Sequence, residues 1–124
     1  ISICLDVLEK NNKYYFFQKT GKNYSLEEFI SIMNKCKVGE FVVNSVDNDG
    51  MMTGFNIKLI KKITKYIKTP IIFVGGAGNP DHFLNLYKSK YFGATGASSI
   101  YHFTQHTPQE VKRILSKIKI PVRI

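Results

Sequence analysis

Four short apolar segments alternate with segments of helical periodicity along this chain of 124 residues. The apolar segments are residues 1–7, 40–46, 70–74 and 93–97, and they are too apolar for strands with one solvated face. Buried strands that are each followed by a helix form a parallel sheet. The sequence therefore predicts a single α/β domain of four strand–helix units, with a small additional strand at residues 14–17 in the first connection.

The helices are predicted from their start signals and apolar spacing. Ser25 and Glu28 have the spacing of a capping box at the start of a helix over residues 25–37. Residues 79–89 begin with an N-cap asparagine and a first-turn proline, and residues 107–118 begin with a second capping box. The expected inward-facing positions are Leu26, Phe29, Ile30, Met33 and Cys36, then Ile57, Ile60, Ile63 and Ile67, and finally Val111, Ile114, Leu115 and Ile118.

Each predicted strand is followed at its carboxyl end by polar or glycine-rich groups. These groups are Asp6, then Asp47, Asp49 and Gly50, then Gly75 to Gly78, and finally Ser98 and Ser99. The carboxyl ends of parallel strands meet at one edge of a sheet or barrel, where ligands bind. The preference of turns for polar residues and glycine would explain such a group after one strand. Its presence after all four predicted strands instead predicts a binding site.

The segment Gly75-Gly76-Ala77-Gly78 lies between a buried strand and a capped helix. Glycines in this position let backbone N–H groups approach an anion at the positive end of a helix dipole. A tight turn explains the same segment equally well when it is taken alone. Ser98 and Ser99 add hydroxyl and amide donors at the next strand end, and the two loops together resemble the phosphate site after the last two strands of a (β/α)8 barrel.

Three carboxylates are candidates for acid–base chemistry: Asp6, Asp47 and Asp49. A partly desolvated carboxylate at a strand end can exchange protons with a substrate. Alternatively, Asp47 or Asp49 caps its own turn. If the strand extends that far, both aspartates face inward and one supports the other, because alternate strand residues share a face.

The formal net charge of +9 suits an anionic ligand or partner. Most of it comes from lysines, and those of residues 58–68 have helical spacing, which favours a solvated helix face over a nucleic-acid groove. Cys4 and Cys36 have no metal-ligand spacing and are expected to be buried free thiols in a reducing cytoplasm. No metal or cofactor motif is present, and no apolar run approaches the ~20 residues of a membrane span.

Several motifs together resemble the cyclase subunit of imidazole glycerol phosphate synthase. They are VNSVDNDGMMTGF, IIFVGGAG followed by Asn79-Pro80-Asp81-His82-Phe83, GASSIYHF, ISICLDV and Lys19-Thr20-Gly21, in matching order and spacing. The resemblance covers nearly the whole chain but only the C-terminal half of the family's (β/α)8 barrel. The segment GASSIYHF and the ending Ile120-Pro121-Val122-Arg123 are most similar to the branch found in surface-polysaccharide gene sets.

The resemblance implies a lyase that takes ammonia from a glutaminase partner and closes an imidazole ring on a ribulosyl formimino carboxamide nucleotide. The products are imidazole glycerol phosphate and an aminoimidazole carboxamide ribotide, and no cofactor is implied. By motif, Asp49 corresponds to the catalytic acid, Asp6 to an assisting carboxylate and Asp47 to a supporting residue. The implied phosphate contacts are Gly50, Gly75, Gly76, Ala77, Ser98 and Ser99.

This sequence departs from the family pattern at three positions. Met51 replaces a threonine after the Asp-Gly pair, Val74 replaces a serine before the glycines, and Asn56 replaces an acid. The loop around Lys22 is longer than is usual in the family. These differences leave the phosphate loops in place. They leave open the exact substrate and whether the pathway is histidine synthesis or surface-sugar modification.

Two other functions fit parts of the pattern. A phosphoribosyl formimino isomerase-like barrel has an Asp-Gly end on a middle strand, but usually lacks the Gly-Ala-Gly loop and the SSIYHF end. A non-catalytic half-barrel that binds phosphate or docks a glutaminase is the third possibility.

The chain starts at Ile1 on an apolar run, which indicates part of a longer protein. The resemblance assigns a second essential aspartate and an ammonia-handling lysine to the other half of the barrel. By itself this chain is therefore expected to bind one phosphate group, to be inactive, and to self-associate through its unpaired sheet edges.

Overall fold

The computed structural model describes residues 1–17, 23–91 and 93–123. The predicted motif Lys19-Thr20-Gly21 and the loop residue Lys22 lie outside these described ranges. The elements in chain order are β1 (Ser2–Lys10), β2 (Lys13–Phe16), β3 (Tyr24–Ser25), α1 (Leu26–Met33), β4 (Glu40–Ser45), α2 (Ile57–Tyr66), β5 (Ile71–Val74), α3 (Pro80–Lys88), β6 (Ala94–Thr95), α4 (Ser99–Phe103) and α5 (Pro108–Lys117).

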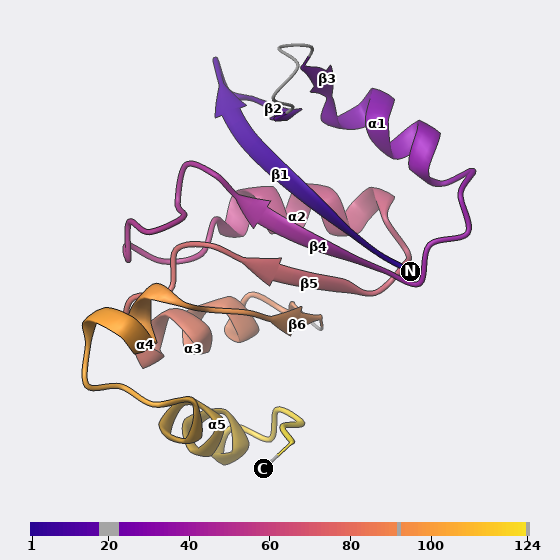
Figure 1. Cartoon of the computed structure of the whole chain (residues 1–124). Helices are drawn as coiled ribbons and strands as arrows, with labels where there is room; N and C mark the ends of the chain where they lie inside the picture. The colour runs from indigo at the N-terminus through magenta and orange to yellow at the C-terminus, as the bar shows by residue number, and fades with distance from the viewer. Residues whose placement is uncertain (18–22, 92, 124) are drawn as a thin grey trace.

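The strands form one sheet in the order β3-β2-β1-β4-β5-β6. Strands β1, β4, β5 and β6 are mutually parallel, and Figure 1 shows β1, β4 and β5 running in the same direction with α2 beside them. The predicted α/β fold of four strand–helix units, half of a (β/α)8 barrel, is confirmed. The predicted small strand is β2, which pairs antiparallel with β1 and with β3 at one end of the sheet.

The two faces of the parallel strands differ in burial. Leu5, Val7, Phe41, Val43 and Phe73 are almost fully buried and belong to the same core cluster as the apolar residues of the helices. The alternate positions form the opposite face, where the register aligns one residue of each strand in a row. One row contains Cys4, Val42, Ile72 and Ala94, and the next contains Asp6, Asn44 and Val74. No residue of these two rows is buried, so this sheet face is open.

The start of α1 matches its prediction, but its end does not. Ser25 accepts a hydrogen bond from the backbone N–H of Glu28, and the Glu28 carboxylate accepts one from the backbone N–H of Ser25, which completes the capping box. The helix ends at Met33 rather than at residue 37. The N–H groups of Lys35 and Cys36 donate to carbonyls three residues back, as in a tightened last turn, so Cys36 lies beyond the helix.

The other start signals are mostly confirmed. Asn79 caps α3, which has proline in its first turn, and Thr107 accepts a hydrogen bond from the backbone N–H of Glu110 at the start of α5. The second capping box is only half formed, because the Glu110 carboxylate pairs with His106 at 2.9 Å instead. The short helix α4 was not predicted. It spans the five residues Ser99–Phe103 and follows directly on the serine loop.

The prediction of buried thiols is wrong for both cysteines. Cys4 is exposed because it lies on the open face of the sheet, and Cys36 is exposed because α1 ends before it. No helix in the described part of the chain is long and apolar enough to cross a membrane.

Candidate functional site

A cavity of about 340 Å³ lies at the carboxyl ends of the parallel strands. Its lining comes from β1, from β4 and the turn after it, and from the loops that follow β5 and β6. The lining residues are Cys4, Asn44, Asp49, Val74, Gly75, Gly76, Ala77, Ala97, Ser98 and Ser99. The structure thus brings together six of the nine residues predicted for the site, while Asp6, Asp47 and Gly50 do not line the cavity.

Asp49 reaches the cavity because β4 ends at Ser45 and the chain turns sharply there. The backbone N–H groups of Asn48 and Asp49 both donate to the Ser45 carbonyl, at 3.1 and 2.9 Å. Gly50 then takes a positive φ of 75°, a conformation that favours glycine. Among the described residues that line the cavity, Asp49 is the only carboxylate.

Asp47 has a different position from the one expected. Its Oδ2 accepts a hydrogen bond of 2.6 Å from the backbone N–H of Glu9, near the end of β1. The condition under which Asp47 and Asp49 would face inward together is not met, because the strand ends at Ser45 and the chain turns before Asp49. Asp47 joins the ends of two neighbouring strands.

Asp6 is connected to the cavity through Asn44. The Asn44 Nδ2 donates a hydrogen bond of 3.0 Å to Asp6 Oδ1, and the two residues are register partners on β4 and β1. Sequence reasoning did not single out Asn44. The available signal was its polarity inside the apolar segment FVVNSV, at a position that shares a face with Val42.

The glycine loop after β5 approaches its neighbours too closely for any side chain. Gly75 and Gly76 have φ values of 96° and 103°. A methyl group at Gly75 would lie 2.9 Å from the Ser45 carbonyl oxygen, and one at Gly76 would overlap the Gly54 carbonyl oxygen. The loop is held from both sides, by Gly54 N–H donating to Gly76 O at 2.8 Å and by Gly78 N–H donating to His82 Nδ1 at 3.0 Å.

Six backbone N–H groups of residues that line the cavity remain available to a ligand. Those of Gly75, Gly76, Ala77, Ala97, Ser98 and Ser99 have no hydrogen-bond acceptor among the described residues. Ser98 is the N-cap residue of α4, and its hydroxyl makes no capping hydrogen bond. Val74 contributes an apolar side chain to the same cavity. This arrangement suits an oxyanion bound mainly by backbone amides.

Cys4 lines the cavity, and its surroundings raise the pKa of its thiol. Partial burial is the larger cause, and the nearby Asp6 carboxylate raises the pKa further. Both effects keep the thiol protonated, which argues against a nucleophilic role. Within the described ranges, no group of three or more histidine, cysteine or acidic residues could hold a metal ion.

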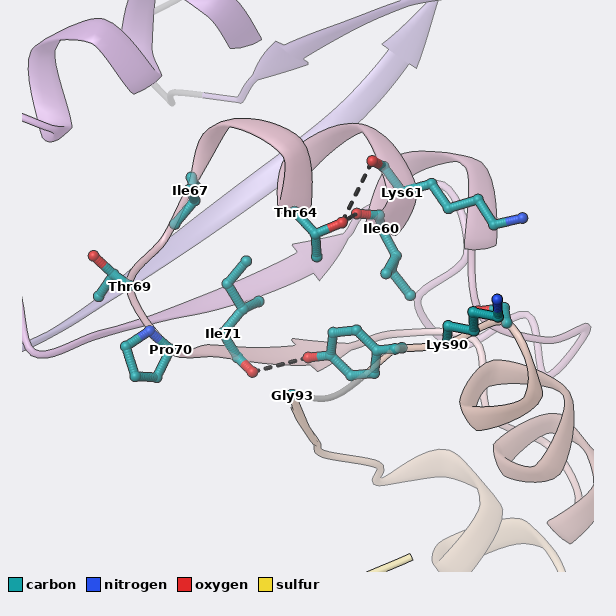
Figure 2. A pocket seen from close by; sticks show the side chains of 11 residues that line it. Ile60, Lys61, Thr64, Ile67, Thr69, Pro70, Ile71, Lys90 and Gly93 are labelled. Atoms are coloured by element: carbon teal, nitrogen blue, oxygen red, sulfur yellow. Dashed lines mark hydrogen bonds between the residues drawn. The ribbon is translucent and has the colours of Figure 1, made fainter.

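A second cavity, of about 270 Å³, lies near the start of β5, at the other end of the strands (Figure 2). Figure 2 shows Lys61 and Lys90 at one end of it and Thr69 and Pro70 at the other. The hydroxyl groups of Tyr91 and Thr64 are used internally: the buried Tyr91 OH donates to Ile71 O at 2.8 Å, and Thr64 donates to Ile60 O at 2.9 Å. Because these bonds stabilise the fold and no carboxylate is among the described residues that line this cavity, it is the weaker candidate.

The family model and the similar proteins point to the same family. The family model for "Histidine biosynthesis protein" matches residues 1–107. Imidazole glycerol phosphate synthase subunit HisF of Methanobrevibacter smithii is 34% identical over 125 residues, which cover 96% of this chain and 46% of that protein. The subunit of Pelodictyon phaeoclathratiforme is 31% identical over 100% of this chain and 51% of that protein. That of Methanosarcina mazei is 40% identical over 69% of this chain and 32% of that protein.

This chain spans about half the length of the first of these relatives. The match of the family model covers most of the 124 residues and includes every strand of the sheet, the glycine loop and both serines of the cavity. On this basis, the chain belongs to the histidine biosynthesis protein family.

Proposed function

We propose that this chain supplies one half of the active site of an imidazole glycerol phosphate synthase-type cyclase. The observation that carries the proposal is a single cavity lined by one carboxylate, Asp49, and by two loops with free backbone amides. A carboxylate and an oxyanion site in one cavity suit a substrate that is anchored by a phosphate and reacts a short distance away. The relatives that bear this enzyme's name support the assignment of the reaction.

The proposed roles of the three aspartates follow from their partners. Asp49 is the proton donor and acceptor, because it lines the cavity. Asp6 assists from the neighbouring strand, with its carboxylate oriented by Asn44. Asp47 has a supporting role, because its hydrogen bond to Glu9 N–H fixes the end of β1 beside the turn that carries Asp49.

The phosphate site is proposed to consist of Gly75, Gly76, Ala77, Ser98 and Ser99. These residues line the cavity, and the backbone N–H group of each has no acceptor among the described residues. Gly50 is kept as a phosphate contact on the strength of the resemblance alone, since it follows Asp49 but does not line the cavity. The net charge of +9 favours the approach of an anionic substrate.

In the proposed reaction the phosphate anchor holds one end of the substrate while Asp49 exchanges a proton with the ring that closes. Placing the substrate in this way removes much of the entropic cost of the step. Ammonia would come from a glutaminase partner, and the second phosphate and the remaining catalytic groups would belong to the other half of the barrel. The two exposed free cysteines fit the proposed location in a reducing cytoplasm.

The proposal is tested by replacing Asp49 with asparagine in the full-length protein. Asp49→Asn keeps the shape of the side chain and removes proton exchange, so ammonia-dependent turnover should fall at least about a hundredfold. The KM should change little, since the phosphate loops are untouched. Turnover is measured with ammonium salts, which makes the assay independent of the glutaminase.

Asp81→Asn is the matched control. Asp81 is an exposed aspartate in the first turn of α3 and does not line the cavity, so this variant should keep wild-type turnover. Normal activity in Asp49→Asn would contradict the catalytic assignment and favour a half-barrel that only binds phosphate.

A further inference from the structure

Asn48 lies between Asp47 and Asp49 but takes part in a separate set of hydrogen bonds. The Ser45 hydroxyl donates to Asn48 Oδ1 at 2.8 Å, and Asn48 Nδ2 donates to the Gly54 carbonyl at 3.3 Å. Ser45 is only 1% exposed, so its hydroxyl depends on this acceptor. Asn48 itself is not part of the cavity lining.

The same chain of bonds continues into the glycine loop. Gly54 N–H donates to Gly76 O at 2.8 Å. The Gly76 carbonyl and the Ala77 N–H belong to one planar peptide group and point in opposite directions. The bond from Gly54 therefore fixes the direction of an N–H group that is free to bind an anion.

Asn48 is also part of the turn that presents Asp49. The backbone N–H groups of both residues donate to Ser45 O, so the Asn48 side chain and the Asp49 backbone are held by the same residue of β4. The Asn48 Cβ is close to the glycine loop as well, since a methyl group at Gly76 would lie 3.1 Å from it.

We propose that Asn48 is a positioning residue that ties the turn carrying Asp49 to the phosphate-binding amide of Ala77. It acts through the Gly54 peptide and touches neither the substrate nor the reacting atoms. This inference rests on the proposed function of the cavity as a phosphate site. It explains what holds Asp49 and the Ala77 amide at a fixed position relative to each other.

Two substitutions separate the two bonds of Asn48. Asn48→Ala removes both of them. Asn48→Asp is nearly isosteric and keeps the acceptor for Ser45, but it replaces the donor to Gly54 O by a carboxylate oxygen. Both variants should therefore loosen the Gly54–Gly76 contact, while only Asn48→Ala leaves the buried Ser45 hydroxyl without its acceptor.

The experiment uses the full-length protein, with inorganic phosphate as the probe. Isothermal titration gives the phosphate affinity, and hydrogen exchange followed by NMR gives the protection of the Gly54 N–H. We expect both Asn48 variants to bind phosphate between about threefold and tenfold more weakly, as for the loss of one hydrogen bond, and to exchange Gly54 N–H faster. Asn85→Ala, at an exposed position of α3, is the matched control and should leave both quantities unchanged.

A purely structural role predicts a different result: a lower unfolding midpoint with wild-type phosphate affinity in the folded protein. That result, or unchanged Gly54 exchange in both variants, would overturn the proposal. Ser45→Ala provides a further check, because the Ser45→Ala/Asn48→Ala double variant should bind phosphate no more weakly than Asn48→Ala. If the wild-type protein binds no phosphate, the proposed function fails, and Gly54 exchange still decides whether Asn48 holds the loop.

Discussion

Gly76 shows how closely two loops of the site approach each other. Its φ of 103° and the overlap that a methyl group would make with the Gly54 carbonyl leave no room for a side chain. Gly76→Ala should therefore destabilise the fold by at least about 3 kcal/mol, because backbone rather than a flexible side chain must move. Urea unfolding of the variant and the wild type measures this difference.

Gly50 is the matched control for Gly76. It also has a positive φ, of 75°, but no atom lies within 4 Å of the position that a methyl group would take. Gly50→Ala should therefore cost only the strain of a left-handed residue, about 1 kcal/mol. Equal losses of unfolding free energy in the two variants would mean that the close approach at Gly76 adds nothing to the cost of the methyl group.

At the scale of single residues, the sequence predicted which groups lie at the strand ends but not the direction of each side chain. Asp49, the glycine loop and the two serines meet in one cavity, as their positions after buried strands indicated. Asp47 could not be placed, because its direction depends on β4 ending at Ser45 and on a free N–H at Glu9 in another strand. Asn44 was missed because its partner, Asp6, lies 38 residues away.

At the scale of elements, local start signals were reliable and ends were not. The caps at Ser25, Asn79 and Thr107 depend on residues within one turn, so the sequence contains the whole motif. The early end of α1 has no such local signal. β6 is only two residues long, shorter than the strand predicted over residues 93–97, and it pairs with Ile72 and Phe73 of β5.

An ion pair between α1 and α2 should make the stability of the fold depend on pH. Lys62 of α2 pairs with Glu27 of α1 at 2.7 Å, and its amine lies over the Tyr14 ring. The hydrogen bond from Lys62 lowers the pKa of Glu27 below its ordinary value of 4.5. Because the pKa of Glu27 is lower in the folded state, the ion pair stabilises the fold at a pH above the pKa of Glu27 in the unfolded chain. This stabilisation is lost as the pH falls through the pKa of Glu27 in the folded state.

Glu27→Gln should therefore lower the free energy of unfolding by about 0.5 kcal/mol at pH 7, a small value because the side chain is half exposed. The difference from wild type should disappear at a pH well below 4.5, and it should shrink in high salt. Urea midpoints measured across this pH range provide the check. A difference that is the same at acid and neutral pH would show that the ion pair is not its source.

At the scale of the whole molecule, the sheet is covered on one face only. The open face includes Val42, Ile72 and Val74, and β6 has no strand on its outer side within the described part of the chain. An apolar cavity of about 730 Å³ between β6 and α5 lies beside that edge. Sequence reasoning predicted the strand–helix alternation, but the amount of uncovered sheet became clear only from the register.

The isolated 124-residue chain should consequently self-associate in a concentration-dependent way at ~100 μM, as measured by sedimentation velocity. Ile72→Lys places a charge on the open face without changing the helix-covered face, and it should shift the chain toward monomer. A monomer for the unchanged sequence at this concentration would contradict the expectation.

Amide NMR of the full-length protein during a titration with inorganic phosphate shows whether the carboxyl ends of the parallel strands form an anion site. We expect saturable shifts of the Gly76, Ala77, Ser98 and Ser99 N–H signals, with a dissociation constant on the order of 1 mM. Thr64 and Ser89, in the cavity at the opposite end of the strands, should not respond. Shifts centred on Thr64 and Ser89, or no saturable shift at the glycine loop, would show that phosphate does not bind at the carboxyl ends of the strands.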